Sequence, residues 1–202
     1  MFALVESGSI TKYLNGNKGI QIGDLKYPRA IYTLWTEAER NAIGIYSITF
    51  DNTNKKDEVW YINTNQSYAF ANNKVTATYG TATAKAHADT TWTAEDEDNG
   101  LGTEGEIAAR GLKYDLIRTV KAQAAGILAE TDWYITRKSE KNTAIPSSIT
   151  THRDAVRSKQ AAMETAITNA SDTAALETLY TFTKQDDGSI ARPLGELPTL
   201  KL

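Results

Sequence analysis

Hydrophobic and polar residues alternate in short segments over the first half of the chain, which predicts β-strands. Residues 45–50 (Ile-Tyr-Ser-Ile-Thr-Phe) alternate with a period of two, and similar runs occur on both sides of them. The predicted strands cover residues 2–6, 8–14, 18–22, 30–34, 45–50, 58–64, 66–71 and 74–86. Thr36 and Glu39 have the spacing of a capping box and predict one short helix, which Gly44 would end. We expect an antiparallel sheet with this helix packed against it.

The second half of the chain shows helical periodicity instead. A long helix is predicted for residues 103–129, starting from a second capping box formed by Thr103 and Glu106. Its apolar stripe consists of Leu112, Leu116, Val120, Ala124 and Ile127. A second long helix should follow Pro146 and end near residue 169. Its stripe consists of Ile149, Val156 and Met163, broadened by Ala155, Ala166 and Ile167. A short third helix is predicted for residues 172–180, capped by Ser171, and residues 192–198 should be extended.

The composition changes near residue 95, from a chain rich in Thr, Asn, Tyr and Gly to one rich in Ala, Glu, Lys and Leu. The change predicts an α+β protein with a β-rich docking domain at residues 1–94 and a helical module at residues 105–202. This module would comprise a helical hairpin, the short third helix and an extended C-terminal tail. Residues 95–104, which begin with Glu-Asp-Glu-Asp and contain Asn99-Gly100, are expected to form an acidic hinge between them.

Bulk properties exclude several classes of protein. The chain has 202 residues, a net charge of −3 and no cysteine, so disulfides and thiolate metal sites are excluded. No apolar run approaches the roughly 20 residues needed to span a bilayer, and the first residues do not resemble a signal peptide. We therefore expect synthesis in the cytoplasm of the producing cell and no membrane partner.

Enzymatic chemistry finds little support in the sequence. Only His87 and His152 offer imidazole bases, and neither accompanies a nucleophile motif or a phosphate-binding loop. The spacing of a calcium loop is matched by Glu95, Glu97, Asn99, Gly100 and Glu106. Two of these positions hold Glu where the tight loop needs Asp, and no helix is expected before them. The sequence predicts no enzyme and no cofactor; it favours a solvated hinge, with ion binding at the acidic tract as the weaker alternative.

The helical half also contains a basic cluster consisting of Arg137, Lys138, Lys141, Arg153, Arg157 and Lys159. Aromatic residues near it that are suited to stacking on bases are limited to Trp133 and Tyr134, so we expect a solvated face rather than nucleic-acid binding. All four tryptophans are interpreted as core or interface anchors.

A resemblance to a known family rests on two segments of the helical half. Residues 127–133 (Ile-Leu-Ala-Glu-Thr-Asp-Trp) resemble the "LL-x-x-(S/T)-D-W" core of phage tail-assembly chaperone domains, including tail-fibre assembly proteins. These domains continue with a proline-containing loop and a helix bearing "YR-x-x-LR", which is similar to residues 152–157. His152 stands in the place of Tyr and Val156 in the place of Leu. The longer loop before Pro146 looks like the variant found in structural proteins of marine tailed phages.

The resemblance implies a protein that works by binding. The implied interface or structural residues are Asp132, Trp133, Arg137, Pro146, Arg153 and Arg157. In a helical hairpin we expect Asp132 to cap or to pair with Arg153 or Arg157, while Trp133 and Ile145 close the end of the hairpin. The implied function is that of a tail structural protein of the baseplate, tail tip or fibre attachment. Its partners would be other tail, baseplate or fibre proteins and copies of itself. The alternative is a tail-fibre assembly chaperone that is absent from the mature virion.

Overall fold

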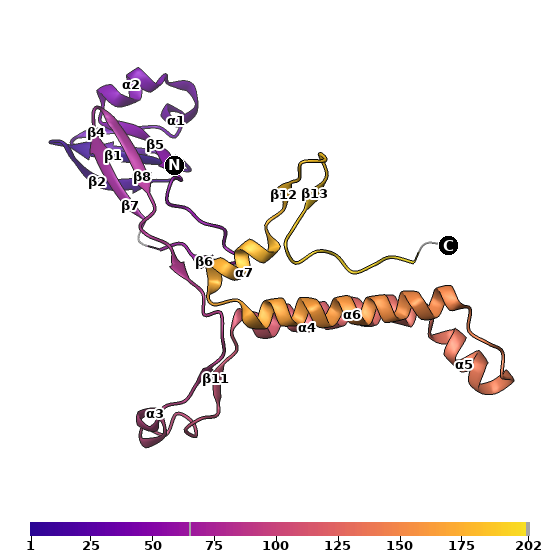
Figure 1. The fold of residues 1–202 in the computed structure, drawn as a ribbon. Helices are drawn as coiled ribbons and strands as arrows, with labels where there is room; N and C mark the ends of the chain where they lie inside the picture. Colours follow the sequence, from indigo (N-terminus) through magenta and orange to yellow (C-terminus); the bar gives the residue numbers. More distant parts are fainter. Residues whose placement is uncertain (65, 201–202) are drawn as a thin grey trace. The chain divides into compact units, whose positions relative to one another are not determined.

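The computed structural model describes residues 1–64 and 66–200, and the chain divides into two compact units, Met1–Thr83 and Ala84–Leu202 (Figure 1). The first unit is rich in β-strands and the second contains the long helices, which confirms the predicted α+β class. The boundary between the units lies at Thr83 and Ala84. The sequence had placed the end of the first domain at residue 94 and the start of the second at residue 105.

The first unit is built on a five-stranded sheet in the order β2-β1-β5-β8-β7. Its strands are β1 (Phe2–Glu6), β2 (Ser9–Leu14), β5 (Ile45–Asp51), β7 (Ser67–Ala71) and β8 (Lys74–Thr78). All neighbouring pairs are antiparallel except β5 and β8, which run parallel and align Ile48 with Val75. The sequence did not predict this parallel pair. The alternation of hydrophobic and polar residues indicates a strand but does not determine whether it runs parallel or antiparallel to its neighbour.

Both faces of this sheet are buried near its centre. Ala3, Val5, Ile48, Val75 and Ala77 form one core cluster. A second cluster consists of Leu4, Ile20, Ile31, Tyr32 and Ile45. Successive side chains of a strand point to opposite faces, so β1 contributes its neighbouring residues to both clusters. For this reason β1 reads as a continuous apolar run in the sequence.

The two outer strands of the sheet approach each other. The ring centroids of Tyr13 on β2 and Tyr68 on β7 lie 4.7 Å apart. This contact shows that the sheet curls strongly, since its edges would otherwise be its most distant parts. Curling of this kind reduces the unpaired edge that an open sheet presents.

Smaller elements complete the unit. They are β3 (Ile20–Ile22), β4 (Leu25–Tyr27), α1 (Ile31–Leu34), α2 (Glu37–Ala42), β6 (Tyr61–Ile62) and β9 (Thr83–Ala84). The prediction of a strand at residues 30–34 was wrong: this segment forms α1, which buries Ile31 and Tyr32 against the second core cluster. The capping box at the start of α2 is confirmed, because the Glu39 amide donates to the Thr36 hydroxyl and the Glu39 carboxylate accepts from the Thr36 amide.

The second unit begins with a two-stranded segment around the acidic tract. β10 (Thr90–Thr91) pairs with β11 (Ile107–Ala109), and α3 (Ala94–Asp98) lies between them. The acidic tract therefore begins with a helix, capped by Thr93 and Asp96. The capping box predicted at Thr103 and Glu106 was wrong. Pairing of β11 with β10 holds this segment extended, and the long helix starts later.

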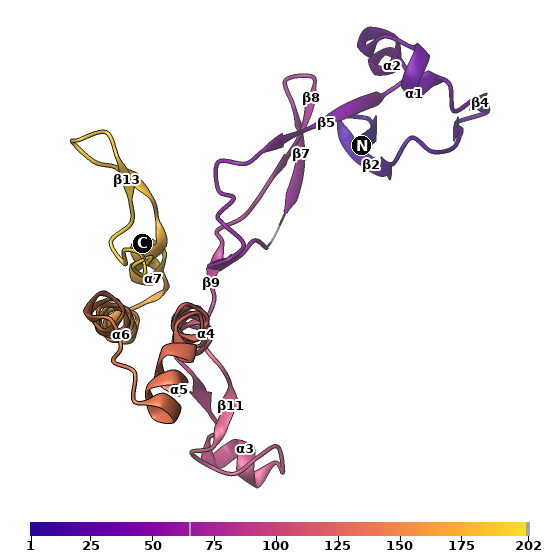
Figure 2. The same cartoon turned by 90° about the vertical axis from the view of Figure 1, so that its right-hand side faces the viewer.

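Two long helices lie side by side in both views (Figure 1, Figure 2). They are α4 (Leu112–Ala129) and α6 (Ser147–Asn169), and between them in sequence lies α5 (Asp132–Lys141), which was not predicted. The predicted apolar stripes are confirmed at their centres, where Val120, Ala124, Val156 and Met163 are buried. Ala155, predicted to broaden the stripe of α6, is exposed instead.

The chain ends with α7 (Thr173–Tyr180) and a hairpin of β12 (Thr183–Lys184) and β13 (Ile190–Ala191). The cap of α7 is Asp172, whose carboxylate accepts from the Ala175 amide, and not the predicted Ser171. Beyond the hairpin, the extended segment docks through Leu194, which is 2% exposed. The Leu194 amide donates to the Leu179 carbonyl, and the Lys159 amine donates to the Leu194 carbonyl at 2.8 Å.

Candidate functional site

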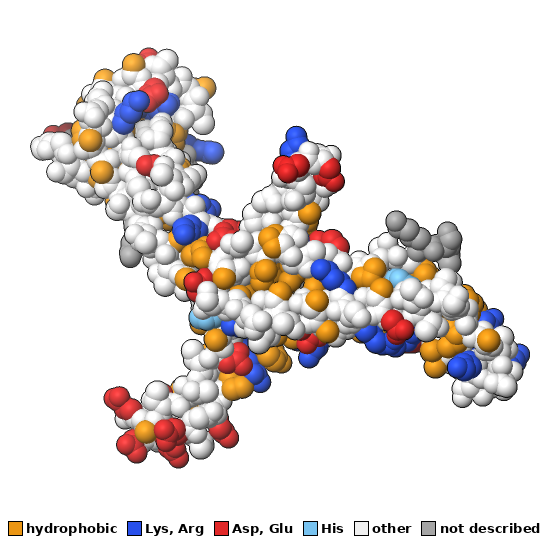
Figure 3. Space-filling view, in the orientation of Figure 1, with side chains coloured by type: hydrophobic (Ala, Val, Ile, Leu, Met, Phe, Trp, Pro, Cys, Tyr) orange, Lys and Arg blue, Asp and Glu red, His pale blue; other side chains and the backbone are white. Residues whose placement is uncertain are grey.

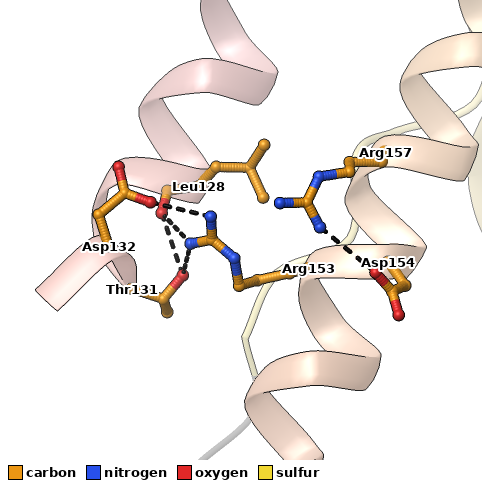
Figure 4. A network of polar contacts seen from close by, with 6 residues as sticks. All are labelled: Leu128, Thr131, Asp132, Arg153, Asp154 and Arg157. Atoms are coloured by element: carbon orange, nitrogen blue, oxygen red, sulfur yellow. Dashed lines mark hydrogen bonds and ion pairs between the residues drawn. The ribbon is translucent and has the colours of Figure 1, made fainter. Parts of the chain in front are cut away.

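The candidate site lies at the end of the helical hairpin where α4 passes into α5, and its central residue is Arg153 of α6 (Figure 4). One guanidinium nitrogen of Arg153 donates to the Leu128 carbonyl at 2.7 Å and to the Thr131 hydroxyl at 2.6 Å. A second nitrogen forms an ion pair with the Asp132 carboxylate at 2.9 Å. Arg153 and Thr131 are buried, while the Asp132 side chain is 61% exposed.

The arrangement satisfies the ends of two helices at once. The Leu128 carbonyl also accepts from the Thr131 amide and hydroxyl. The C-terminal carbonyls of a helix carry the negative end of its dipole, so a buried cation is favourable there. Asp132 is the first residue of α5, where a carboxylate complements the positive end of that helix. Arg153 therefore fixes the direction in which the chain leaves α4. The expected pairing of Asp132 with Arg153 is confirmed.

Arg157 is not part of this network. It lies one turn further along α6, is exposed, and pairs with Asp154 at 3.3 Å (Figure 4). Exposed ion pairs of this kind contribute little to stability. Of the two arginines that the sequence offered as partners for Asp132, the structure selects the one on the buried face of α6.

Contrary to the expectation from the sequence, Trp133 does not close the end of the hairpin. Its side chain is 51% exposed, because Asp132 starts a new helix and Trp133 falls on the outer face of α5. Its ring lies 3.7 Å from that of Tyr134, and the Arg137 guanidinium lies 4.7 Å from the Trp133 centroid and 5.1 Å from that of Tyr134. Ile135, which follows Tyr134 in the sequence, is also exposed, at 44%. The tryptophan thus belongs to an exposed aromatic and cationic cluster.

Pro146 defines the start of α6. It is the N-cap residue, with φ −55° and ψ 139°, and its carbonyl accepts from the Ile149 amide at 3.1 Å. The preceding helix α5 ends at Asn142, which adopts the left-handed conformation. Ile145, expected to fill the hairpin end together with Trp133, is half-buried. His152, which replaces the tyrosine of the resemblance, is buried beside Arg153 in the sequence of α6.

The other end of α4 is anchored by Asp89. Its carboxylate accepts from the Gly111 amide at 2.8 Å and from the Arg110 guanidinium at 2.6 Å. These two donors hold the pKa of Asp89 below its ordinary value, the Gly111 amide being the larger cause. Gly111 precedes α4 as its N-cap, and a Cβ there would lie 2.2 Å from the Ala88 carbonyl oxygen. This close approach requires a glycine.

The acidic residues considered as ion ligands do not converge. The Glu97 carboxylate accepts from the Glu104 amide at 2.9 Å, and Glu95 and Asn99 lie on and just after α3. Glu106 immediately precedes β11. In residues 1–64 and 66–200, no three His, Asp or Glu side chains are grouped so that they could hold a metal ion.

A hollow of about 610 Å³ lies in the first unit, beside β2 and β3. Its lining contributes the cations Lys12 and Lys18, the phenols Tyr13 and Tyr32, and the amides Asn15 and Gln21. These side chains form no recognisable catalytic grouping.

Sequence reasoning missed three parts of the site: the Thr131 hydroxyl, the Leu128 carbonyl and the stacking of Tyr134 on Trp133. Thr131 stands at the (S/T) position of the resembling segment, so its residue type was a signal whose role was not assigned. The backbone carbonyl carries no signal in the sequence, because every residue has one.

The comparisons with known proteins add no identity. No protein-family model, no curated protein and no solved structure matches this chain. Among the described residues, no helix is long and apolar enough to cross a membrane.

Proposed function

We propose that this chain is a non-enzymatic structural protein of a bacteriophage tail, at the baseplate, tail tip or fibre attachment, and that it acts through protein–protein contacts. One observation carries the proposal. The two segments that resemble phage tail-assembly domains, residues 127–133 and 152–157, meet in one network, in which Arg153 binds Leu128, Thr131 and Asp132 (Figure 4). The resemblance therefore involves residues that act together in the fold.

The surface of the chain supports a binding role. Its accessible area is 13200 Å². Two separate compact units of these lengths would expose about 11,000 Å² in total by the usual scaling of surface with mass. The excess is comparable to the 1,200–2,000 Å² or so that a specific protein–protein interface buries. A chain with so much surface is typical of proteins that complete their packing in an assembly.

Large apolar side chains lie on that surface. In the second unit they include Leu101, Ile107, Tyr114, Trp133, Ile135, Phe182 and Ile190, each at least 42% exposed. Tryptophan and tyrosine are the residues most often found at the centre of interfaces, where they contribute most of the binding energy. These positions are the expected contacts with other tail proteins or with further copies of the chain.

Mass spectrometry of purified virions tests the proposal. We expect the chain to be present in fixed ratio to a known tail component, after density-gradient purification and a high-salt wash. A non-structural protein of the same phage serves as the control for contamination and should be lost. Absence of the chain from washed particles, together with its recovery from infected cells in complex with a fibre protein, would assign it to the assembly chaperones instead.

A further inference from the structure

Two exposed surfaces of the second unit carry opposite charge. The acidic arm, residues 92–107, contains Glu95, Asp96, Glu97, Asp98, Glu104 and Glu106 and has no lysine or arginine. The basic tip, α5 (Asp132–Lys141), carries Arg137, Lys138 and Lys141. It also contains Glu140 and Asp132, but the Asp132 carboxylate is already paired with Arg153. Figure 3 shows red side chains gathered around α3 and blue side chains around α5.

The cations of the basic tip form no ion pair within residues 1–64 and 66–200. Among the described residues, no ion pair joins Arg137, Lys138 or Lys141 to a carboxylate. The Nε atom of Arg137 is shielded from solvent and lacks a hydrogen-bond acceptor in that part of the chain. The Arg137 guanidinium lies over the Trp133 and Tyr134 rings, and a guanidinium binds carboxylates through its planar set of N–H donors.

Each surface also presents apolar side chains beside its charges. On the acidic arm, Leu101 is 60% and Ile107 is 44% exposed. On the basic tip, Trp133 is 51% and Ile135 is 44% exposed. Protein interfaces combine a desolvated apolar centre with a polar rim, and complementary rims select the partner. The two surfaces therefore match in both respects.

The acidic arm and the basic tip do not meet within one chain. The arm precedes α4 and the tip follows it, and the 18 residues of α4 span about 27 Å. Figure 1 shows α3 and α5 well apart at opposite ends of α4. No ion pair between the two surfaces occurs in the described residues. A contact between these two surfaces would therefore join two copies of the chain.

We propose that the basic tip of one copy binds the acidic arm of a second copy. This contact is heterologous, since each copy uses two different surfaces, so successive copies add head to tail and form a ring if the rotation closes. This inference rests on the proposed binding function. The binding partner is a second copy of the same chain.

Charge-reversal variants of the full chain, measured by sedimentation velocity over a concentration series, test the inference. The tip variant is Lys138→Glu with Lys141→Glu, and the arm variant is Glu95→Lys with Asp98→Lys. The arm variant leaves Asp96 in its cap and Glu97 bound to the Glu104 amide. Each variant alone should self-associate at least about tenfold more weakly than the wild type. An equal mixture should regain association, because the unchanged basic tip of the arm variant can bind the unchanged acidic arm of the tip variant.

The control is Lys74→Glu with Lys184→Glu, which reverses two exposed lysines outside both surfaces and should leave association unchanged. Association of the wild type should also weaken at about 1 M salt, where the screening length is roughly 3 Å. Three results would overturn the inference: a wild type that stays monomeric at low salt, single variants that associate as the wild type does, or a mixture that is not rescued.

Zero-length carboxyl-to-amine crosslinking of mixed isotope-labelled and unlabelled wild type gives a second test that needs no variant. Crosslinks between copies should join Glu95 or Asp98 to Lys138 or Lys141, and crosslinks confined to other surfaces would contradict the contact. These results are separable from the virion test. A chain found in virions that does not self-associate keeps the proposed function and loses this inference.

Discussion

The ion pair between Arg153 and Asp132, at 2.9 Å, joins the buried face of α6 to the first residue of α5. The same guanidinium binds the Leu128 carbonyl and the Thr131 hydroxyl. We expect Arg153→Met, which keeps much of the volume but removes these donors, to lower the free energy of unfolding by about 2–4 kcal/mol. Hydrogen bonds from a charged group contribute roughly 1.5–3 kcal/mol each when buried. Urea denaturation measures the change.

The matched control for this variant is Arg157→Met. Arg157 is exposed and pairs with Asp154 alone among the described carboxylates, so its replacement should cost less than about 0.5 kcal/mol. An equal loss in the free energy of unfolding for the two arginine variants would show that the network around Arg153 stabilises the fold no more than an exposed ion pair does.

Gly111, the N-cap of α4, and Gly126, inside that helix, should respond in opposite directions to alanine. Gly111→Ala places a Cβ 2.2 Å from the Ala88 carbonyl oxygen, and relieving this overlap should cost about 1–3 kcal/mol. Gly126→Ala meets nothing within 4 Å in the interior of α4 and should stabilise the protein by about 0.5–1 kcal/mol. Thermal unfolding of both variants provides the comparison. A stabilising Gly111→Ala would mean that the contact with Ala88 is not maintained in solution.

Trp133→Ala should have little effect on the isolated chain. The side chain is 51% exposed and stacks on Tyr134 and Arg137, so we expect a loss of about 1 kcal/mol or less. Met163→Ala, at a position 2% exposed, should cost about 2–5 kcal/mol by comparison. Guanidinium denaturation separates these cases. If Trp133→Ala were as damaging as Met163→Ala, the tryptophan would be part of the core and not of an exposed cluster.

Acid should weaken the protein through carboxylates that are hydrogen-bonded in the folded state. The pKa of Asp89 is lowered by the Gly111 amide and by Arg110, and that of Asp96 by the amide and hydroxyl of Thr93. Because the folded pKa lies below the unfolded value near 3.8, each group contributes full stability above that value. The contribution is lost as the pH falls through the folded pKa.

Stability measured against pH should therefore decline below the ordinary carboxyl range and remain level above it. Asp89→Asn should make this decline shallower, since one of the coupled protons is removed. A decline of unchanged steepness in that variant would count against a perturbed Asp89.

Local sequence signals were sufficient where the structure depends on neighbouring residues. The strand at residues 2–6 has its predicted limits, and the Thr36–Glu39 capping box forms as expected. Thr103 and Glu106 have the same spacing, yet they lie before β11 and begin no helix. The difference is tertiary, because β11 pairs with β10 and Gly111 packs against Ala88, so the helix starts only at Leu112.

The candidate site shows the same division. The residue types of the site and the pairing of Asp132 with an arginine of the following helix were predicted from the sequence. The exposure of Trp133 was not predicted, because α5 was not recognised. Its apolar residues, Trp133, Tyr134 and Ile135, are consecutive and are followed only by charged and polar residues, so none recur at helical spacing.

By itself, the sequence determined the α+β class, the paired long helices and the set of residues at the end of their hairpin. These follow from hydrophobic periodicity and from capping chemistry, which act over a few residues. Only the tertiary structure decided that Arg153, and not Arg157, binds Asp132, since that choice depends on which face of α6 is buried against α4. It also decided that Trp133 lies outward with Arg137, because the direction of α5 is fixed by contacts between residues far apart in the chain.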